Sequence, residues 1–565
     1  MRTINYETDL CVIGGGLSGV CAAISAARHN VKVVLVQDRP VLGGNSSSEI
    51  RMWVGGAKGK DNRESGLIEE IECENYYYNR SNIFPMWDTV LYQKVLAEKN
   101  ITLLLNTTCN QCDYQNNHIN SVSCWQLNTE TTHVIKAKVF ADCSGDSILA
   151  GLTGAACMYG RESKKDFNES IPPEIADKKT MGMSCMFQIR ETDSPKKFIK
   201  PPFAYTYKSD EELPFKDHKK LKDNNFWWIE YGGELDCIHD ADKCREELLK
   251  IAYGVWDHIK NQQDHGADNW EMAWIGFLPG KRESRRYIGK YIVNENDVNN
   301  AGKHFDDIIA YGGWTMDDHF PGGFYYKDSY PTIFHPAPSP WGLPYRALVH
   351  RDFDNLMFAG RNISVTHAAL SSSRVMATCA LLGQALGTAV SIMKEDNVNP
   401  ATIDVKKLQA RLMNDDCYLP FMRRIPSELN KNAVHSCPIL VNGIERGDEN
   451  MHVGDLNKPI SIELNKPAII NGIRLVFDSD LNRKFDNMPC TYLLNEDRYR
   501  TAKTMIKDFN LVFTLENGQK EVVEIKDNFL RFVKVPFNKA IKKVELLPLS
   551  NYGAEKAHVF DFELY

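Results

Sequence analysis

The sequence predicts an α/β protein with an inserted α+β domain and a C-terminal all-β sandwich. Three observations lead to this fold class. A strand–turn–helix–strand unit begins near the N-terminus, residues 160–335 are rich in Trp, Tyr, Phe, Gly and Pro, and short strands broken by Asn, Gly and Pro follow residue 436. The chain has 565 residues, a length that suits about three to four domains.

The N-terminal unit consists of two apolar segments on either side of an alanine-rich one. We interpret TDLCVI (8–13) and VKVVLV (31–36) as buried strands and LSGVCAAISAARH (17–29) as the helix between them. Apolar runs without alternation are typical of parallel strands that are covered on both faces. The unit is therefore expected to be a βαβ motif of a parallel sheet.

The turn between the first strand and the helix has the pattern G-x-G-x-x-G. Gly14 permits the tight turn, Gly16 lets the backbone approach a pyrophosphate, and Gly19 lets the helix pack closely on the sheet. The helix begins with Leu17 and Ser18, whose N–H groups lie at the positive end of the helix dipole. Because the motif stands between a strand and a helix, it predicts a dinucleotide-binding site.

The second strand ends in VVLVQDR, where an acid that binds a ribose is expected. Gln37 lies 18 residues after Gly19, close to the usual spacing of about 20. Its amide can bond ribose hydroxyls, and Asp38 can take that role if the strand end is shifted by one residue. Arg39 would suit the 2′-phosphate of NADP. These residues alone leave the three alternatives open.

The same domain is expected to continue in later segments. Residues 101–125 alternate like a β-meander, and residues 134–141 lead as a strand into DCSGD. The strand NLMFAG (355–360) precedes a long helix at 375–393, and residues 400–413 form a further helix. The segment at 375–393 is uncharged over 19 residues, so its length alone would allow a transmembrane span. Its polar residues and its many Ala and Gly favour a closely packed buried helix instead.

The composition narrows the classes of partner and compartment. A net charge of −7 gives no electrostatic footprint for nucleic acid, so we expect no nucleic-acid partner. Because the segment at 375–393 is interpreted as a buried helix, we expect no membrane span either. The 15 cysteines suit a reducing compartment and no signal peptide is visible, so we expect a cytoplasmic protein. Cys109 and Cys112 form a C-x-x-C pair, which we interpret as strand residues rather than as a redox dithiol or half of a zinc site. No metal site is predicted.

Three sequence blocks carry a resemblance to a known family. They are residues 9–51 (DLCVIGGGLSGV through RPVLGGNSSSEIR), 139–149 (VFADCSGDSIL) and 354–387 (DNLMFAG through GQALG), accompanied by PGKRESRR at 279–286. On these blocks the chain resembles FAD-dependent oxidoreductases whose flavin domain is of the glutathione reductase type. The resemblance implies FAD as the cofactor, so Arg39 no longer indicates NADP. No second G-x-G-x-x-G occurs on a βαβ unit, which argues against a separate NAD(P)H domain.

The resemblance also implies a set of cofactor contacts. The loop after the second strand would run along FAD, the second block would return to it, and the third would aim a helix N-terminus at the flavin. Besides the N-terminal residues named above, the implied contacts are Gly43, Gly44, Asn45 and Ser46 of the loop, Cys143, Ser144 and Gly145 of the second block, and Gly360, Arg361 and Ser373 of the third.

We therefore expect four parts along the chain. The FAD-binding domain is discontinuous, with residues 1–160 and 340–398, and a substrate or cap domain of residues 161–339 is inserted into it. A helical linker at 399–435 leads to a sandwich at 436–565, which resembles galactose-binding-like domains of the discoidin type.

Candidate catalytic residues follow from the chemistry of a flavin oxidoreductase. Oxidation of an alcohol requires a base beside the hydroxyl while hydride moves to flavin N5. His367 is the best-placed base along the chain, and the alternative is a packing histidine. Arg346, Arg282 and Arg285 would orient an anionic or polyhydroxylated substrate, although the 282–286 cluster suits ion pairs between domains equally well. Weaker candidates are His319, His335 and His350.

The predicted function is an FAD-dependent oxidoreductase that transfers hydride between flavin N5 and a small hydroxylated substrate, with sugars among the candidates. The aromatic residues at 226–233 and 311–326 would form a sugar-stacking platform or, alternatively, part of a core. One alternative is a carbohydrate-binding or assembly protein that uses FAD structurally. A tRNA-modifying flavoprotein is a further alternative, disfavoured by the lack of a basic face. The oligomeric state is not predicted.

Overall fold

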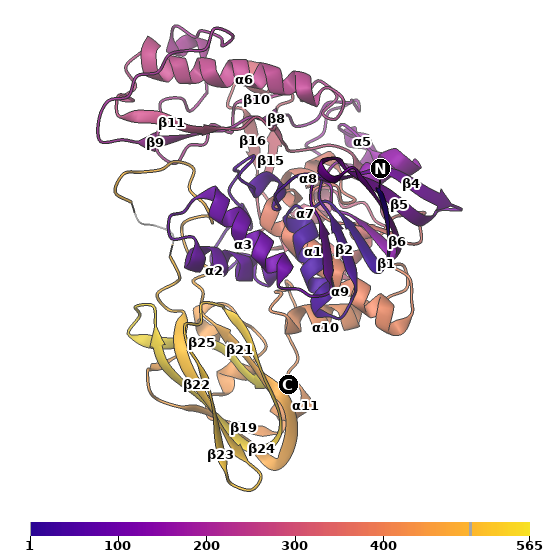
Figure 1. Ribbon diagram of the computed structural model, residues 1–565, viewed down its shortest axis with the longest axis vertical. Helices are drawn as coiled ribbons and strands as arrows, with labels where there is room; N and C mark the ends of the chain where they lie inside the picture. Colours follow the sequence, from indigo (N-terminus) through magenta and orange to yellow (C-terminus); the bar gives the residue numbers. More distant parts are fainter. Residues whose placement is uncertain (1, 497–499) are drawn as a thin grey trace.

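The protein has three parts, which a computed structural model describes for residues 2–496 and 500–565. Figure 1 shows an insert around α6 (Ala241–Asp257) at the top, an α/β domain in the middle and an all-β domain at the bottom. The predicted fold class, an α/β dinucleotide-binding domain with an inserted domain and a C-terminal sandwich, is confirmed.

The α/β domain is built on a seven-stranded sheet. Its strands are β1 (Arg2–Ile13), β2 (Val33–Val36), β3 (Ile101–Leu104), β4 (Thr107–Gln115), β5 (His118–Gln126), β6 (Thr131–Asp142) and β18 (Leu356–Phe358). The order is β3-β2-β1-β6-β5-β4, and β18 also pairs with β6. β3, β2, β1, β6 and β18 are parallel to their neighbours, whereas β4 and β5 form an antiparallel meander that joins the first half of β6.

The ends of four strands are in register. Ile13 of β1 pairs with Val36 of β2 and with Asp142 of β6, which in turn pairs with Phe358 of β18. The loops that follow these strands therefore leave the sheet at one edge. In open α/β sheets this carboxyl edge is where ligands bind.

β1 is longer than the strand predicted at 8–13. It begins at Arg2, and its first half pairs with β6 from Thr131 onward. This half alternates between exposed and half-buried residues, so it lacks the apolar run on which the prediction depended. β2 is shorter than predicted and begins at Val33, after Asn30 turns the chain with a φ of +62°.

Two helices of the α/β domain are in direct backbone contact. α1 (Leu17–Arg28) packs on α9 (Met376–Asp396), and a Cβ at Gly383 would lie 1.9 Å from the carbonyl oxygen of Ser18. Among the described residues, α9 alone is long and apolar enough to cross a membrane, and 94% of its most apolar window is buried inside the protein. The predicted buried helix at 375–393 is confirmed.

The other helices of this domain surround the sheet. α10 starts later than the helix predicted at 400–413, because the Asp404 carboxylate accepts hydrogen bonds from the N–H groups of Lys406 and Lys407 and so caps the first turn. The helices are α2 (Leu67–Tyr78), α3 (Phe84–Leu96), α4 (Ile148–Thr153), α8 (His367–Ser373) and α10 (Val405–Asn414).

The insert consists of small antiparallel sheets, of which β8 (Met183–Ser184) and β10 (Glu230–Tyr231) pack against α6 and β14 (Ile308–Gly312) packs against α9. Phe226 and Trp228 are fully buried in its apolar core, so these two aromatic residues belong to the core rather than to a stacking platform. The strands are β7 (Cys157–Met158), β8 (Met183–Ser184), β9 (Phe187–Glu191), β10 (Glu230–Tyr231), β11 (Trp270–Ile275), β12 (Gly280–Lys281), β13 (Arg286–Tyr287), β14 (Ile308–Gly312), β15 (Met316–His319), β16 (Thr332–His335) and β17 (Trp341–Pro344). The short helices are α5 (Lys164–Phe167) and α7 (Glu295–Asn299).

The C-terminal domain is an antiparallel sandwich. Its strands are β19 (Ala433–His435), β20 (His452–Asp455), β21 (Ile460–Phe477), β22 (Ile506–Leu515), β23 (Lys520–Ile525), β24 (Phe532–Asn551) and β25 (Lys556–Leu564), with α11 (Glu428–Lys431) before them. The order is β20-β25-β21-β24-β22-β23, with β19 beside β21. The long strands β21 and β24 are bulged, which lets them bend around one apolar core.

Buried ion pairs join the sandwich to the segment that precedes it. Arg531, 1% exposed, binds the Asp416 carboxylate through Nε at 3.0 Å. Arg424 lies before the first strand and binds Asp561 of β25 at 2.7 Å. These contacts fix the sandwich against the end of the α/β domain.

Candidate cofactor and substrate site

The turn between β1 and α1 has space for a side chain at one glycine only. Gly14 has a φ of +104°, and a Cβ there would lie 2.4 Å from the Cys143 carbonyl oxygen. A Cβ on Gly19 would lie 1.8 Å from the carbonyl oxygen of Gly14. At Gly16, a Cβ would meet nothing nearer than the Gly44 Cα, at 3.9 Å. The turn is therefore closed by packing at Gly14 and Gly19 and open at Gly16.

A cavity of about 380 Å³ lies beside Gly16, among the loops that follow β1, β2, β6 and β18. This is the carboxyl edge of the parallel strands. The predicted contacts that line it are Gly14, Gly16, Leu17, Ser18, Gln37, Asp38, Arg39, Gly43, Gly44, Asn45, Cys143, Ser144, Gly145, Gly360 and Arg361. The structure thus brings together residues from all three sequence blocks.

Three predicted contacts are not among the lining residues. Gly19 packs beneath the turn. The Ser46 hydroxyl donates to the Gly43 carbonyl at 2.9 Å and accepts from Trp87 Nε1 at 3.2 Å, so it holds its own loop. Ser373 is buried at the end of α8.

Gln37 uses its amide inside the protein. Its Oε1 accepts from the Gly15 N–H at 2.6 Å, and its Nε2 donates to the Val41 carbonyl at 3.1 Å. The side chain, 4% exposed, therefore ties the glycine-rich turn to the loop after β2. The side chain of Asp38 is 57% exposed at the same cavity. The predicted ribose contact consequently fits Asp38 better than Gln37.

Asp146 is a lining residue that the sequence analysis did not single out. Its carboxylate binds Lys281 Nζ and Arg361 Nη2, each at 2.6 Å. Burial alone would raise the pKa of Asp146, but Arg361 and Lys281 hold it well below its ordinary value. The available signal was the acid at the end of DCSGD, but its partners lie more than a hundred residues away in sequence.

A smaller chamber of about 110 Å³ adjoins the cavity on the side of the insert. Both hollows are lined by Asn45, Lys281, Arg361, Arg374 and Met376. The remaining walls of the chamber are Ile50, Met52, Trp53, Gly55, Ser184, Met186, Gly280, Arg282, Trp314, Asp317 and Val375.

The chamber has a cationic wall, which we define as Lys281, Arg282, Arg361 and Arg374. Two buried donors of this wall, Arg361 Nη1 and Arg374 Nε, have no hydrogen-bond partner in the described part of the protein. Asp317 is the one carboxylate among the chamber's described lining residues. The wall therefore offers unsatisfied positive donors beside a single acceptor.

Asp317 begins a chain of buried ionisable groups. Its Oδ2 lies 3.3 Å from His319 Nε2, and His319 Nδ1 lies 2.6 Å from Glu230 Oε2. Burial alone would lower the pKa of His319, but Glu230 and Asp317 raise it above its ordinary value. Burial would raise the pKa of Asp317, yet His319 and Arg374 hold it well below its ordinary value. Asp317 thus presents an ionised carboxylate to the chamber at neutral pH.

The match to a family model covers both hollows. Residues 9–412 match the model described as FAD dependent oxidoreductase. The chain belongs to the FAD-dependent oxidoreductase family. The predicted cofactor and the predicted enzyme class are thereby confirmed.

Curated relatives of this oxidoreductase match over short segments. It is 40% identical to glycerol-3-phosphate dehydrogenase of Mycobacterium leprae over 68 residues, which are 12% of each chain. It is 51% identical to soluble pyridine nucleotide transhydrogenase of Marinobacter nauticus over 40 residues, 7% of this chain and 9% of the relative. The chain thus spans only a small part of the length of these relatives.

Solved structures are similar to parts of the oxidoreductase. A geranylgeranyl bacteriochlorophyll reductase-like protein from Thermoplasma acidophilum is 11% identical, with a TM-score of 0.33, over 73% of this chain and 85% of that one. A family 32 carbohydrate-binding module from Streptococcus pneumoniae EndoD is 14% identical, with a TM-score of 0.20, over 25% of this chain and 99% of the module.

The lining of the larger cavity fits FAD. Gly16 leaves open the place that a pyrophosphate needs, and this glycine gives the first turn of α1 no side-chain cap. Arg361 has a buried donor without a partner, as expected where a cofactor atom belongs. Gly14, Gly16, Asp38, Asn45 and Arg361 would therefore hold FAD in this oxidoreductase.

His367 does not line the cavity or the chamber of the oxidoreductase. This first residue of α8 is 1% exposed, with Nδ1 3.0 Å from Glu283 Oε2 and Nε2 3.0 Å from Asp318 Oδ1. Burial alone would lower the pKa of His367, but the two carboxylates raise it to about 10. An imidazolium with both N–H groups engaged has no lone pair for a substrate proton. The predicted role of general base therefore does not fit this geometry.

Of the three predicted arginines, only Arg282 lines the chamber. Arg285 donates through Nε to the Asp146 carbonyl at 3.1 Å and lies outside the lining. Arg346 is half exposed and pairs with Asp307 at 2.9 Å, also outside it. Arg374, which the sequence analysis did not single out, occupies the place expected for Arg346.

Cys109 and Cys112 lie on β4 as predicted. A hydrogen bond with Cys124 and burial raise the pKa of Cys109, and burial raises the pKa of Cys112 to about 12. Reactive dithiols require a lowered thiol pKa. These environments therefore do not suit a redox pair.

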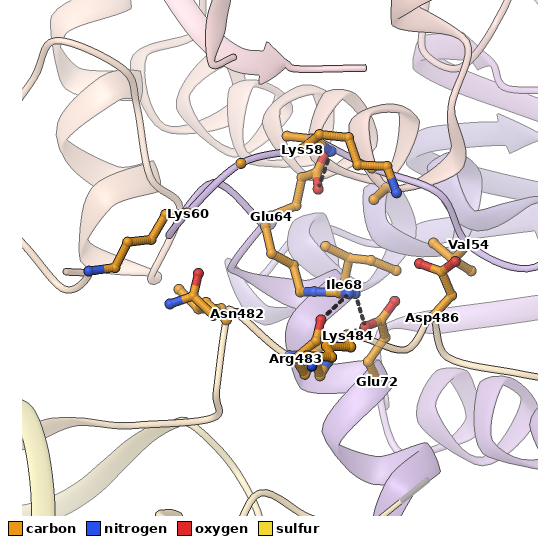
Figure 2. Close-up of a pocket in the computed structure, with 16 residues that line it drawn as sticks. Val54, Lys58, Lys60, Glu64, Ile68, Glu72, Asn482, Arg483, Lys484 and Asp486 are labelled. Carbon is orange, nitrogen blue, oxygen red and sulfur yellow. Dashed lines mark hydrogen bonds and ion pairs between the residues drawn. The ribbon is translucent and has the colours of Figure 1, made fainter. Parts of the chain in front are cut away.

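A further cavity of about 350 Å³ lies where the loop after residue 54 meets residues 481–486. Figure 2 shows Lys58, Lys60, Glu72, Arg483 and Asp486 around it. Its acids and bases bind one another, as in the ion pair between Glu72 and Arg483. It shares no described lining residue with the FAD cavity or the chamber. We assign it to the junction between the α/β domain and the sandwich.

Proposed function

We propose that this FAD-dependent oxidoreductase acts on a small hydroxylated substrate that carries a negative charge. The observation behind the proposal is the chamber beside the FAD cavity, where the cationic wall faces the single carboxylate of Asp317. FAD, when bound, exchanges two electrons with a substrate as hydride. The residues of the chamber would select and orient that substrate.

The cationic wall would bind the anionic end of the substrate. Arg374 Nε is buried and unpartnered, and a carboxylate or phosphate of the substrate would satisfy it. Arg282 is held in place because its Nη2 donates to the Trp227 carbonyl at 2.9 Å. Fixed donors lose little entropy when they bind, which favours a bidentate anion over a neutral hydroxyl.

Asp317 would orient the substrate hydroxyl. Because its pKa is low, the carboxylate stays ionised and accepts a hydrogen bond from the substrate O–H group. The same low pKa makes it a weak base, so its role is to position the hydroxyl. His319 and Glu230 fix the Asp317 carboxylate from behind. The aromatic rings of Trp53 and Trp314 complete the chamber around the carbon skeleton.

The names of the curated relatives agree with this substrate class. Glycerol-3-phosphate dehydrogenase is named for a substrate with hydroxyl groups and an anionic end. The alignment covers 12% of each chain, so it supports the class of substrate and not the compound.

The test is anaerobic reduction of the bound flavin by matched pairs of compounds. Glycerol is paired with glycerol 3-phosphate, and glucose with gluconate, and bleaching of the visible flavin absorption is recorded. We expect the charged member of a pair to reduce the flavin faster than its neutral partner. Equal rates for charged and neutral members would overturn the proposal.

Substitution of an arginine in the cationic wall is the second test of the proposal. We expect Arg374→Gln to lower kcat/KM for the charged substrate about 10- to 100-fold, with activity expressed per bound FAD because Arg374 also lines the FAD cavity. Arg351→Gln removes an exposed arginine outside both hollows and serves as the matched control. A loss of activity that is equal in the two variants would contradict a role for the wall.

A further inference from the structure

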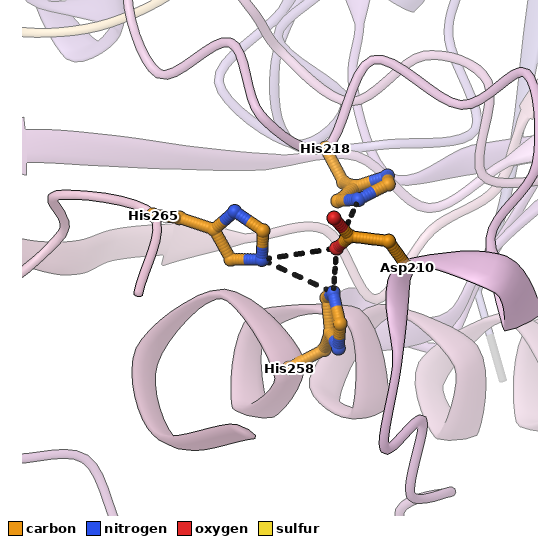
Figure 3. Close-up of side chains that lie close together, drawn as sticks. All are labelled: Asp210, His218, His258 and His265. Atoms are coloured by element: carbon orange, nitrogen blue, oxygen red, sulfur yellow. Dashed lines mark hydrogen bonds and ion pairs between the residues drawn. The ribbon is translucent and has the colours of Figure 1, made fainter. Parts of the chain in front are cut away.

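Three histidines and an aspartate from distant parts of the insert meet at one point. Asp210 begins a short 3-10 helix (Asp210–Glu212), and His218 follows in the next loop. His258 begins the π-helical turn after α6, and His265 lies in the loop beyond it. Figure 3 shows the four side chains pointing toward one another. One ligand atom from each lies within 4.8 Å of all the others.

Four of the six separations between these atoms are close to those of a tetrahedral metal site. Asp210 Oδ1 lies 3.0 Å from His218 Nε2, 3.1 Å from His258 Nε2 and 3.4 Å from His265 Nε2. The Nε2 atoms of His258 and His265 are 3.2 Å apart. Four ligands at about 2.0–2.1 Å from a Zn²⁺ ion stand about 3.3 Å from one another.

His258 is oriented by a backbone carbonyl behind its ring. Its Nδ1 donates to the Tyr207 carbonyl, 2.9 Å away. Its Nε2 therefore faces the Asp210 carboxylate, 3.1 Å away, and a cation there would be bound by both atoms. A carbonyl behind a histidine ligand is also the usual arrangement at metal sites.

The three rings are shielded while the carboxylate is accessible. The side chains of His218, His258 and His265 are at most 5% exposed, whereas that of Asp210 is 25% exposed. Lys219 also contacts Asp210, but its side chain is 65% exposed and can turn to solvent.

The geometry points to a Zn²⁺ site with His218, His258, His265 and Asp210 as its four ligands. The prediction of no metal site considered only the cysteine spacing and did not weigh these histidines. Four protein ligands close the coordination shell, which is typical of a structural site rather than a catalytic one.

The site has a clear mechanical role. Residues 192–229 contain no helix or strand except the 3-10 turn at Asp210. A segment of this length without regular structure needs a separate anchor. The ion would fasten it to the end of α6, the helix that contacts β8, whose Ser184 lines the chamber.

The first test is the metal content of the full-length holoenzyme. We expect one Zn²⁺ per chain by mass spectrometry of metals, and its loss in His258→Ala and in His265→Ala, with affinity lowered at least about 100-fold. His239→Ala, an exposed histidine next to α6, should keep the metal and is the matched control. Equal metal content in all three variants would refute the assignment.

A second measurement uses only the unaltered protein, in case the variants do not fold. The protein is treated with chelator, and ZnCl₂ is then added while heat of binding and Tm are followed. We expect stoichiometric binding and a rise in Tm, because a ligand of the folded state stabilises it. MgCl₂, a hard ion that prefers oxygen ligands, should do neither. Absence of both effects with Zn²⁺ would overturn the proposal, whatever the flavin content.

Discussion

Glu64 is a single buried carboxyl group whose ionisation opposes folding. It is 2% exposed, it accepts hydrogen bonds from the Ala57 N–H at 3.0 Å and the Thr378 hydroxyl at 3.1 Å, and burial raises its pKa from 4.5 to about 7. The folded state therefore binds more protons than the unfolded state between pH 4.5 and pH 7. It follows that the free energy of unfolding falls as the pH rises through this window.

We expect Glu64→Gln to remove this dependence. The amide oxygen still accepts both hydrogen bonds and carries no charge, so the variant should be more stable than the parent by about 1–3 kcal/mol at pH 8 and nearly equal at pH 4.5. Thermal unfolding across this pH range measures the difference. The same change at the exposed Glu516 is the control, and a constant difference across the range would contradict the expectation.

The sequence alone was enough to predict those site residues whose role depends on backbone geometry. Gly14, Gly16 and Gly19 were predicted because a side chain at any of them would obstruct either the turn or the bound dinucleotide. The partners of Gln37 and His367 were not predictable in the same way. Which atoms an amide or an imidazole meets depends on loops that come together only in the folded chain.

In the turn that joins β1 to α1, one glycine is needed for cofactor binding and another for folding. At Gly16 a Cβ meets only Gly44 at 3.9 Å, so Gly16→Val should fold and yet occupy the place of the pyrophosphate. At Gly19 a Cβ would lie 1.8 Å from the Gly14 carbonyl oxygen, so Gly19→Val should disrupt the packing of α1 on the sheet.

We therefore expect Gly16→Val to lose FAD with little change in Tm relative to the FAD-free parent. Gly19→Val should lose FAD together with at least about 3 kcal/mol of stability, as expected for severe overpacking. Flavin absorbance and circular dichroism of the two purified variants distinguish these outcomes. Retention of FAD by Gly16→Val would show that the pyrophosphate lies elsewhere.

Elements with a continuous apolar pattern were predicted well. Elements that form only because they pair with a neighbouring strand were not. The uncharged stretch at 375–393, which forms most of α9, indicated a buried helix, and the small residues along it indicated close packing. The first half of β1 gave no such signal, because its side chains alternate at the surface and β6 alone makes it a strand.

At the scale of the molecule, a buried charge holds the sandwich in place. Arg531 binds the Asp416 carboxylate at 3.0 Å, and both are almost fully buried. Arg531→Met should destabilise the protein by about 3–5 kcal/mol, because it leaves the Asp416 charge buried without a partner. The double variant Arg531→Met/Asp416→Leu should recover most of this loss.

Calorimetric unfolding of these variants is the measurement. Lys534→Met is the control, because Lys534 pairs with Asp415 at 2.8 Å with a side chain that is 40% exposed, and such pairs contribute less than about 1 kcal/mol. A Tm loss in Arg531→Met no larger than in Lys534→Met would show that the pair does not secure the sandwich.

The arrangement of whole domains was predictable in outline, and the chamber was not. The fold class and FAD followed from motifs that are contiguous in sequence. The cationic wall, the Asp317 chain and the histidine cluster each combine side chains that are far apart in the sequence. Their spacing has no period that a sequence pattern could reveal.

The discontinuity of the sheet has a consequence for biosynthesis. β18, α8 and α9 follow the whole insert in sequence, yet α9 covers α1, and the loop after β18 supplies Gly360 and Arg361 to the cofactor cavity. During translation the apolar face of α1 emerges from the ribosome long before its partner is made. The nascent chain must therefore keep this face from aggregating until α9 appears, and the lining of the cofactor cavity is complete only after that point.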